Sequence, residues 1–243
     1  MSTVYNNFDW SKLNRKDIFD HFYLLKDKIV EKELSQTSIY RIYKNHARKL
    51  GPVISKKIKS FNVDHGYIYI GGTYYPDKDE ECRPSIELGF YFNPWDDKIR
   101  YSHKRFRRAC IILADTILHE IVHMRQYRRR NFSSRPNYIS NASTEQKKTD
   151  QSYMGNYDEI DTYSFNIACE LHSHFSTNIS EITKYLNQTN KNAKKSFTWK
   201  WYLKTFDYDH NHPVIRKLKT KIIKYIPSAK LGKPYKNNSY LWY

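Results

Sequence analysis

Hydrophobic residues recur along the chain at two periods, and each period predicts a different kind of element. Spacings of three and four residues predict amphipathic helices, whereas alternation of aromatic and β-branched residues predicts strands. We expect the two alternating stretches to be antiparallel neighbours, and a long polar stretch between two helices to form a loop. The helical stretches are 16–32, 37–50, 102–130, 157–175, 180–186, 197–206 and 213–226, the strands are 65–75 and 85–92, and the loop is 131–153.

Residues that cap helices mark several of these boundaries. Thr37 or Ser38 can begin the second helix, which stops at Gly51-Pro52. Ser102 can begin the longest helix, whose end is rich in arginine, as the helix dipole favours. Asn156 can begin the next long helix. The order of elements predicts an α+β fold, in which a small antiparallel sheet packs on the long helix and extra helices stand at both ends of the chain.

The length of 243 residues is enough to bury a full hydrophobic core. We expect three parts packed together as one domain: an N-terminal helical segment at 1–60, a core at 61–178 and a basic, aromatic helical extension at 179–243. No apolar run is long enough to span a membrane, and the N-terminus lacks the apolar core of a secretory signal.

Three scattered cysteines, Cys82, Cys110 and Cys169, form no C-x-x-C pair and no disulfide framework. We expect Cys110 and Cys169 to be small core residues, because both fall within helical patterns. These features favour a cytoplasmic, reducing setting. The abundance of Lys, Asn, Ile and Tyr favours an AT-rich genome, viral or bacterial. The sequence does not predict an oligomeric state.

Basic residues outnumber acidic ones by 42 to 25, which gives a formal net charge of +17. Such an excess indicates a polyanionic partner such as nucleic acid, or else a solvated lysine-rich surface. The densest basic clusters are 104–108, 125–130 and 191–195.

The chemistry of the chain centres on His119-Glu120-Ile121-Val122-His123. On a helix, residues four apart lie on one face, so His119 and His123 can offer two imidazole nitrogens to one ion. Glu120 can reach a water on that ion. This is the H-E-x-x-H arrangement of zinc hydrolases, with two Zn²⁺ ligands and a general base. The alternative is a pair of ordinary histidines on an amphipathic helix.

A catalytic zinc needs a third protein ligand and an open position for water. Glu159, on the next long helix, is the ligand that we predict. Asp158, Asp161 and His172 are alternative third ligands. Glu159 also has an alternative role in a capping box, in which its carboxylate accepts a hydrogen bond from the backbone N–H of the N-cap residue. Asp161 is the carboxylate that we expect to orient a ligand histidine. Tyr153, Tyr157, Tyr163 and His172 are all available to stabilise an oxyanion.

The pattern His119-Glu120-x-x-His123, followed by Glu159-x-x-Thr162-Tyr163-x-Phe165 and Ala168-x-Glu170-Leu171, resembles that of gluzincin-type zinc metallopeptidases. It is most similar to the compact ImmA/IrrE-like metallopeptidases and covers residues 102–175. The family has Ala-Asn where this chain has Thr162-Tyr163, and a shorter connecting loop. The resemblance implies a zincin-like fold, with Zn²⁺ on His119, His123 and Glu159 and with Glu120 as base.

The resemblance also implies a protein or peptide substrate that pairs with an edge strand of the sheet, for which Ser85–Phe92 is our candidate. The predicted function is therefore hydrolysis of peptide bonds by a zinc-activated water. Two alternatives are a structural or nucleic-acid-associated protein that retains a zincin scaffold, and an SprT-like protease that acts on DNA-bound proteins. In the second case a third histidine, His172 or His174, would replace Glu159.

Overall fold

The computed structural model describes residues 13–51, 53–75, 85–131, 133, 135–188 and 195–229. Cys82 and residues 191–194 of the third basic cluster lie outside the described residues. The chain divides into two compact units, Met1–Ser133 and Ser134–Tyr243, and each unit is described by itself. The boundary falls inside the stretch 61–178 that we expected to form the core. Each helix that the structure describes is too short or too polar to cross a membrane.

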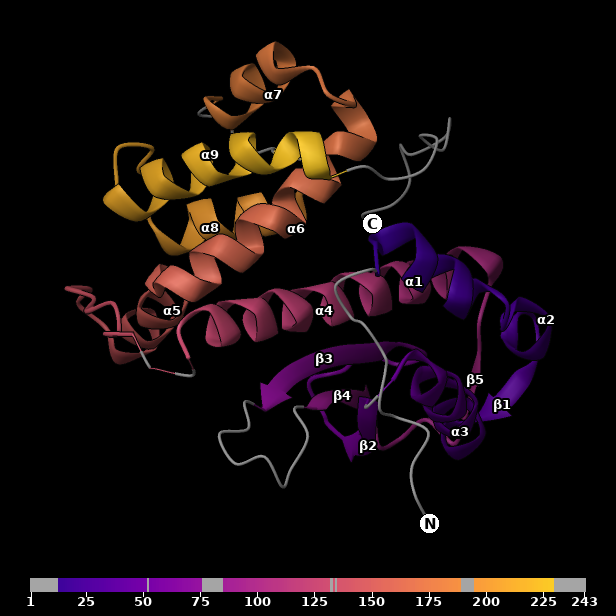
Figure 1. Cartoon of the computed structure of the whole chain (residues 1–243). Coiled ribbons are helices and arrows are strands. Elements are labelled where there is room, and N and C mark those ends of the chain that lie inside the picture. The colour runs from indigo at the N-terminus through magenta and orange to yellow at the C-terminus, as the bar shows by residue number, and fades with distance from the viewer. Residues whose placement is uncertain are drawn as a thin grey trace. The chain divides into compact units, whose positions relative to one another are not determined.

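The first unit is α+β, and a three-stranded sheet lies at its centre (Figure 1). Strand β4 (Ser85–Phe92) is the central strand. It pairs antiparallel with β3 (Ile68–Tyr75) on one side and parallel with β2 (Val53–Lys59) on the other. A second, two-stranded sheet joins β1 (Glu33–Ser35) to β5 (Lys98–Arg100). The sequence therefore predicted the pairing of β3 with β4 correctly.

Two of the predictions about the sheet were wrong. The three-stranded sheet is mixed and not antiparallel, because β2 runs parallel to β4. The sequence of β2, VISKKIK, carries three lysines that interrupt its alternation, so the strand was missed. In addition, Ser85–Phe92 is not an edge strand, since both of its edges are paired over the described residues, and the edges of the sheet belong to β2 and β3.

Helices α3 (Gln36–Ala47) and α4 (His103–Arg129) cover one face of this sheet. Tyr43 of α3 is fully buried and stacks on Phe90 of β4, with ring centroids 5.6 Å apart. Helix α4 packs along β3, as Figure 1 shows.

The N-terminal helices differ in detail from the prediction. The stretch 16–32 forms two helices, α1 (Arg15–Tyr23) and α2 (Lys26–Ile29), which are followed by α3 and a 3-10 turn, η2 (Arg48–Leu50). The cap of α3 is Ser35, whose hydroxyl accepts from the N–H of Ser38, and not Thr37 or Ser38 itself. The helical segment ends at Gly51, as predicted. The φ angle of Gly51 is 112°, a value that glycine adopts readily and other residues rarely.

Ser102 caps α4 as predicted, since its Oγ accepts from the N–H of Arg105 at 3.3 Å. Arg15 of α1 forms a two-point ion pair with Asp115 of α4, which fixes α1 along the helix. The side chains of this pair are only 11% and 21% exposed. Cys110 of α4 is buried among apolar residues, as expected, and burial raises the pKa of its thiol to about 12.

The second unit is helical, with α6 (Tyr157–Phe175) at its centre (Figure 1). Its other helices are α5 (Glu145–Gly155), α7 (Ile179–Leu186), α8 (Phe197–Thr205), α9 (Pro213–Tyr225) and the 3-10 turn η3 (Ile226–Ser228). Helix α9 packs closely against α6. Ser164 is fully buried between them and donates its hydroxyl to the carbonyl of Ile160.

Helix α5 was not predicted, because residues 131–153 were expected to form a loop. Thr144 caps α5 by accepting from the N–H of Lys147. The helix buries only Gln151, Met154 and Gly155, so its sequence shows no apolar stripe. Cys169 of α6 is buried, as predicted.

Two histidines join α1 to α3. Nε2 of His21 lies 2.9 Å from the carbonyl oxygen of His46, and Nε2 of His46 lies 2.7 Å from that of His21. The rings stack with centroids 4.1 Å apart. Burial lowers the pKa of both imidazoles, and Lys49 lowers both further. Protonation of both rings would place two like charges in contact.

We therefore expect the thermal midpoint of unfolding to fall between pH 7.5 and pH 5.5. Both pKa values are lower in the folded chain than in the unfolded chain, where histidine titrates near about 6.5. The unfolded state thus binds more protons as the pH falls, and stability is lost. Differential scanning fluorimetry of a His21→Asn/His46→Gln double variant should show a smaller fall than the wild type. Equal falls in the two proteins would contradict this role.

Candidate metal centre and catalytic residues

His119 and His123 lie one turn apart on α4, and their side chains converge. Their Nε2 atoms are 3.1 Å apart. Two imidazoles that bind one zinc ion at about 2.0–2.1 Å in tetrahedral geometry have nitrogens about 3.3 Å apart. The two Nε2 atoms therefore already stand at the separation that a shared ion requires. His119 is only 8% exposed.

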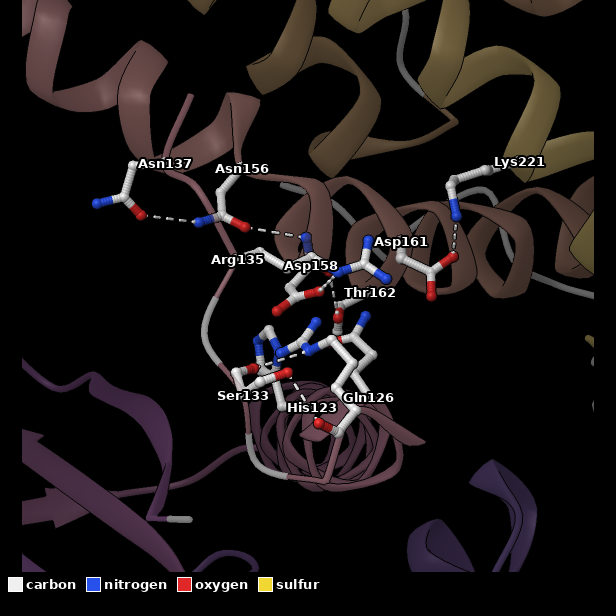
Figure 2. A network of polar contacts seen from close by, with 11 residues as sticks. His123, Gln126, Ser133, Arg135, Asn137, Asn156, Asp158, Asp161, Thr162 and Lys221 are labelled. Atoms are coloured by element: carbon white, nitrogen blue, oxygen red, sulfur yellow. Dashed lines mark hydrogen bonds and ion pairs between the residues drawn. The ribbon is translucent and has the colours of Figure 1, made fainter. Parts of the chain in front are cut away.

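Gln126 orients one of these imidazoles. Nδ1 of His123 lies 2.9 Å from Oε1 of Gln126, three residues further along α4 (Figure 2). An amide oxygen only accepts hydrogen bonds, so Nδ1 of His123 carries the proton and donates it. Nε2 then keeps its lone pair for a metal. Such a partner commonly fixes the ring orientation and tautomer of a ligand histidine.

Sequence reasoning missed Gln126 and proposed Asp161 for this role. Asp161 lies on α6, where it accepts a hydrogen bond from Tyr225 at 2.8 Å and forms an ion pair with Lys221 (Figure 2). Gln126 is 8% exposed. The position of Gln126 could have indicated this role, because a residue three positions after His123 lies on the same face of the helix.

Glu120 is buried on α4, with 5% of its surface exposed. It lies against Gly72 of β3. A Cβ atom added to Gly72 would stand 2.8 Å from Oε1 of Glu120 and 2.6 Å from Cγ2 of Thr116. The glycine thus provides the space in which the carboxyl group of Glu120 sits beside an edge strand. Glu120, directly after His119 in the helix, is the residue that we predicted from the sequence as general base.

Glu159 lies in the first turn of α6, in the second unit. Asn156 caps this helix as predicted, by accepting from the N–H of Asp158 at 3.0 Å (Figure 2). The capping box that competed with metal binding is not formed, because the backbone N–H of Asn156 donates to the carbonyl of Tyr153 at 3.1 Å.

Two tyrosines lie beside Glu159 within the second unit. The hydroxyl groups of Tyr153 and Tyr163 are 3.3 Å apart. Burial of its hydroxyl, followed by Tyr163 and then Glu159, raises the pKa of Tyr153, although 46% of the surface of the residue is exposed. Tyr153 therefore keeps its proton at neutral pH and can donate a hydrogen bond.

The other candidates for an oxyanion donor are placed differently. Tyr157 is surrounded by cations, with Arg135 and Lys217 each 4.1 Å from its ring centroid and Lys221 at 4.5 Å. The nearby Lys221 lowers the pKa of the Tyr157 hydroxyl. His172 stands thirteen residues after Glu159, which is about 20 Å along the helix.

The remaining acidic residues of α6 have other partners. Asp158 lies 4.0 Å from Nε of Arg135 (Figure 2). Glu170 is buried and accepts hydrogen bonds from the hydroxyls of Ser196 and Thr198, the latter at 2.7 Å. It thereby anchors the start of α8.

Comparison of the chain with protein-family models, with curated proteins and with solved structures finds no match.

The contact between Gly72 and Glu120 can be tested with a neighbouring glycine as control. We expect Gly72→Ala to cost about 1–3 kcal/mol of stability, because its methyl group overpacks the contact of β3 with Thr116 and Glu120. At Gly71, on the opposite face of β3, an added Cβ meets no atom closer than 3.5 Å. Gly71→Ala should stay within about 0.5 kcal/mol of the wild type. Urea unfolding followed by circular dichroism measures both changes, and equal effects would contradict the close packing at Gly72.

Proposed function

We propose that the protein is a zinc metallopeptidase, in which His119, His123 and Glu159 bind the ion and Glu120 is the general base. The observation that carries the proposal is the 3.1 Å separation of the two Nε2 atoms, with the buried carboxyl group of Glu120 on the same helix. A structural zinc site has no use for a base in that position, whereas a hydrolytic site requires one.

The proposal for Glu159 rests on chemistry and on local structure. Each of the three residues offers one ligand atom, an imidazole nitrogen or a carboxylate oxygen, which are donors that zinc prefers. Glu159 lies in the first turn of α6, beside Tyr153. Glu159 and His172 are too far apart along α6 to bind the same ion. A glutamate as third ligand favours the gluzincin type over the SprT-like alternative.

In this mechanism a bound zinc ion would acidify a water molecule and polarise the carbonyl group of the substrate. Glu120 takes the proton of the attacking water and passes it to the leaving amine. Gln126 holds His123 in the tautomer that binds metal. Tyr153, which is protonated at neutral pH, is our choice for donating a hydrogen bond to the oxyanion.

We propose a zincin-like arrangement for the first unit and a peptide substrate that is bound in extended form. The substrate would add to the edge of β3, which pairs with no further strand among the described residues, next to Gly72 and Glu120, and not to β4 as the sequence analysis expected. We also propose a cytoplasmic setting, since Cys110 and Cys169 are buried free thiols.

Metal content is the first test of the proposed ligands. We expect one zinc per purified chain, lost in His119→Ala and in Glu159→Ala, as measured by plasma mass spectrometry after dialysis. Asp161→Asn is the matched control, because Asp161 is on the same helix but binds Lys221 and Tyr225, and it should keep its zinc. Zinc lost in Asp161→Asn and kept in Glu159→Ala would refute Glu159 as the third ligand.

The role of Glu120 is tested by Glu120→Gln, which removes the base but keeps the shape of the side chain. We expect this variant to keep its zinc and to lose peptide cleavage by a factor of at least about 100, as is typical for loss of a general base. Cleavage of a fluorogenic peptide library measures the effect. Unchanged cleavage with zinc bound would remove Glu120 from the mechanism.

Gln126→Leu tests the orientation of His123. The substitution removes the acceptor for Nδ1–H while it keeps a buried side chain of similar size. We expect zinc affinity to fall about 10- to 100-fold, because an unsupported imidazole samples other orientations and tautomers. Competition with a chromogenic chelator measures the affinity. Gln126→Glu, which keeps an acceptor, should retain more affinity than Gln126→Leu, and the reverse order would contradict this role.

A further inference from the structure

The second unit carries an aromatic surface that begins beside Glu159. We use this name for four residues that are exposed or partly exposed: Tyr153, Tyr163, Phe197 and Trp201. Tyr163 follows Glu159 by four residues on α6, so the two side chains lie on one face of the helix, one turn apart. Burial, then Tyr163 and then Glu159 raise the pKa of Tyr153, which is 46% exposed. Glu159 therefore lies at one end of the aromatic surface.

Three other rings hold Tyr163 at the centre of this surface. Its ring meets that of Tyr153 at 80° with centroids 6.4 Å apart, that of Trp201 at 88° and 5.7 Å, and that of Tyr202 at 69° and 5.6 Å. Edge-to-face contacts of this kind are favourable and fix the orientation of a ring. Tyr202 is fully buried and donates its hydroxyl to the carbonyl of Met154 at 3.1 Å. The aromatic surface is thus supported by the core of the unit and needs no rearrangement to bind a ligand.

Helix α8 continues the aromatic surface toward solvent. One face of this helix packs into the unit through Trp199, Tyr202 and Leu203. The opposite face is exposed, and its residues are spaced three and four apart: Phe197, Lys200, Trp201 and Lys204. Phe197 is 64% exposed and Trp201 is 37% exposed.

Two lysines set the charge beside the aromatic surface. Lys200 and Lys204 lie on the same face of α8 as Trp201, and α8 carries no acidic residue. The acidic residues that follow α8 and precede Tyr153 bind partners within the unit: Asp207 pairs with Lys147, and Asp150 accepts a hydrogen bond from Gln146. Aromatic rings can bind cations as well as apolar groups, but two neighbouring ammonium groups repel a cationic ligand. The surface therefore favours an uncharged aromatic or large aliphatic group.

We propose that the aromatic surface binds a large uncharged side chain of the peptide substrate, above all an aromatic one, beside the bond that is cleaved. This inference rests on the proposed function, because Glu159 joins the surface to the metal site. A peptide whose carbonyl group lies at an ion on Glu159 places a neighbouring side chain near Tyr163 and Trp201. Apolar side chains of substrates are commonly selected by such aromatic linings. Trp201 is then a residue that determines specificity and takes no part in the chemical step.

Cleavage of three glycine-rich fluorogenic peptides tests the proposal, with one variable residue that is phenylalanine, alanine or arginine. We expect zinc-loaded full-length protein to cleave the phenylalanine peptide with a kcat/KM at least about 10-fold above that of the alanine peptide, as apolar burial predicts. The arginine peptide should be no better than the alanine peptide. Trp201→Ala should lower the ratio of phenylalanine to alanine cleavage nearly to one and keep its zinc, whereas Trp201→Phe should retain the preference.

Trp95→Ala is the matched control, because Trp95 is 72% exposed in the first unit and lies outside the aromatic surface. Its ratio should equal that of the wild type. A folded, zinc-bound Trp201→Ala protein with the wild-type ratio would refute the proposal and leave the proposed function intact. A wild-type preference for arginine would refute it as well.

Binding separates this proposal from the proposed function. Wild-type protein that cleaves none of the peptides would contradict the proposed function. The same peptides with an N-methylated backbone, which resist cleavage, then measure binding by isothermal titration calorimetry. Tighter binding of the phenylalanine peptide that Trp201→Ala abolishes would support the aromatic surface, and equal binding of the phenylalanine and alanine peptides would refute it. Self-association of the chain that Trp201→Ala abolishes, seen by analytical ultracentrifugation, would also overturn the proposal, because a second copy would then occupy the surface.

Discussion

The close approach of α4 to strand β3 is the contact on which the first unit depends. Gly72 makes it possible, because any side chain there would collide with Thr116 and Glu120. The same contact buries the carboxyl group of Glu120 beside an edge of the sheet. Arg15 and Asp115 hold α1 along α4, so the helix that carries the two histidines is fixed by a sheet and by another helix. A rigid helix keeps the two Nε2 atoms at the separation that a metal requires.

The second unit supplies its candidate ligand by a different means. Helix α6 is surrounded by the other helices of the unit, and its polar residues are divided among separate tasks. Glu170 anchors α8, Asp161 binds α9 and Asn156 caps the helix. Glu159 lies in the first turn of the same helix, beside Tyr153.

The two faces of the small sheet have different chemistry. One face packs its aromatic and aliphatic side chains under α3 and α4, whereas the other carries tyrosines, the paired glycines Gly71 and Gly89, and Lys56.

The sequence by itself determined the features that depend on local periodicity. Helices α4 and α6, their caps Ser102 and Asn156, the pairing of β3 with β4 and the convergence of His119 with His123 all follow from spacing within one or two elements. Tertiary structure alone decided the rest. The parallel pairing of β2 moved Ser85–Phe92 to the centre of the sheet, and the space at Gly72 and the choice of Gln126 over Asp161 became visible only in the fold. These features depend on which residues distant in sequence come into contact, and neither hydrophobic periodicity nor capping chemistry carries that information.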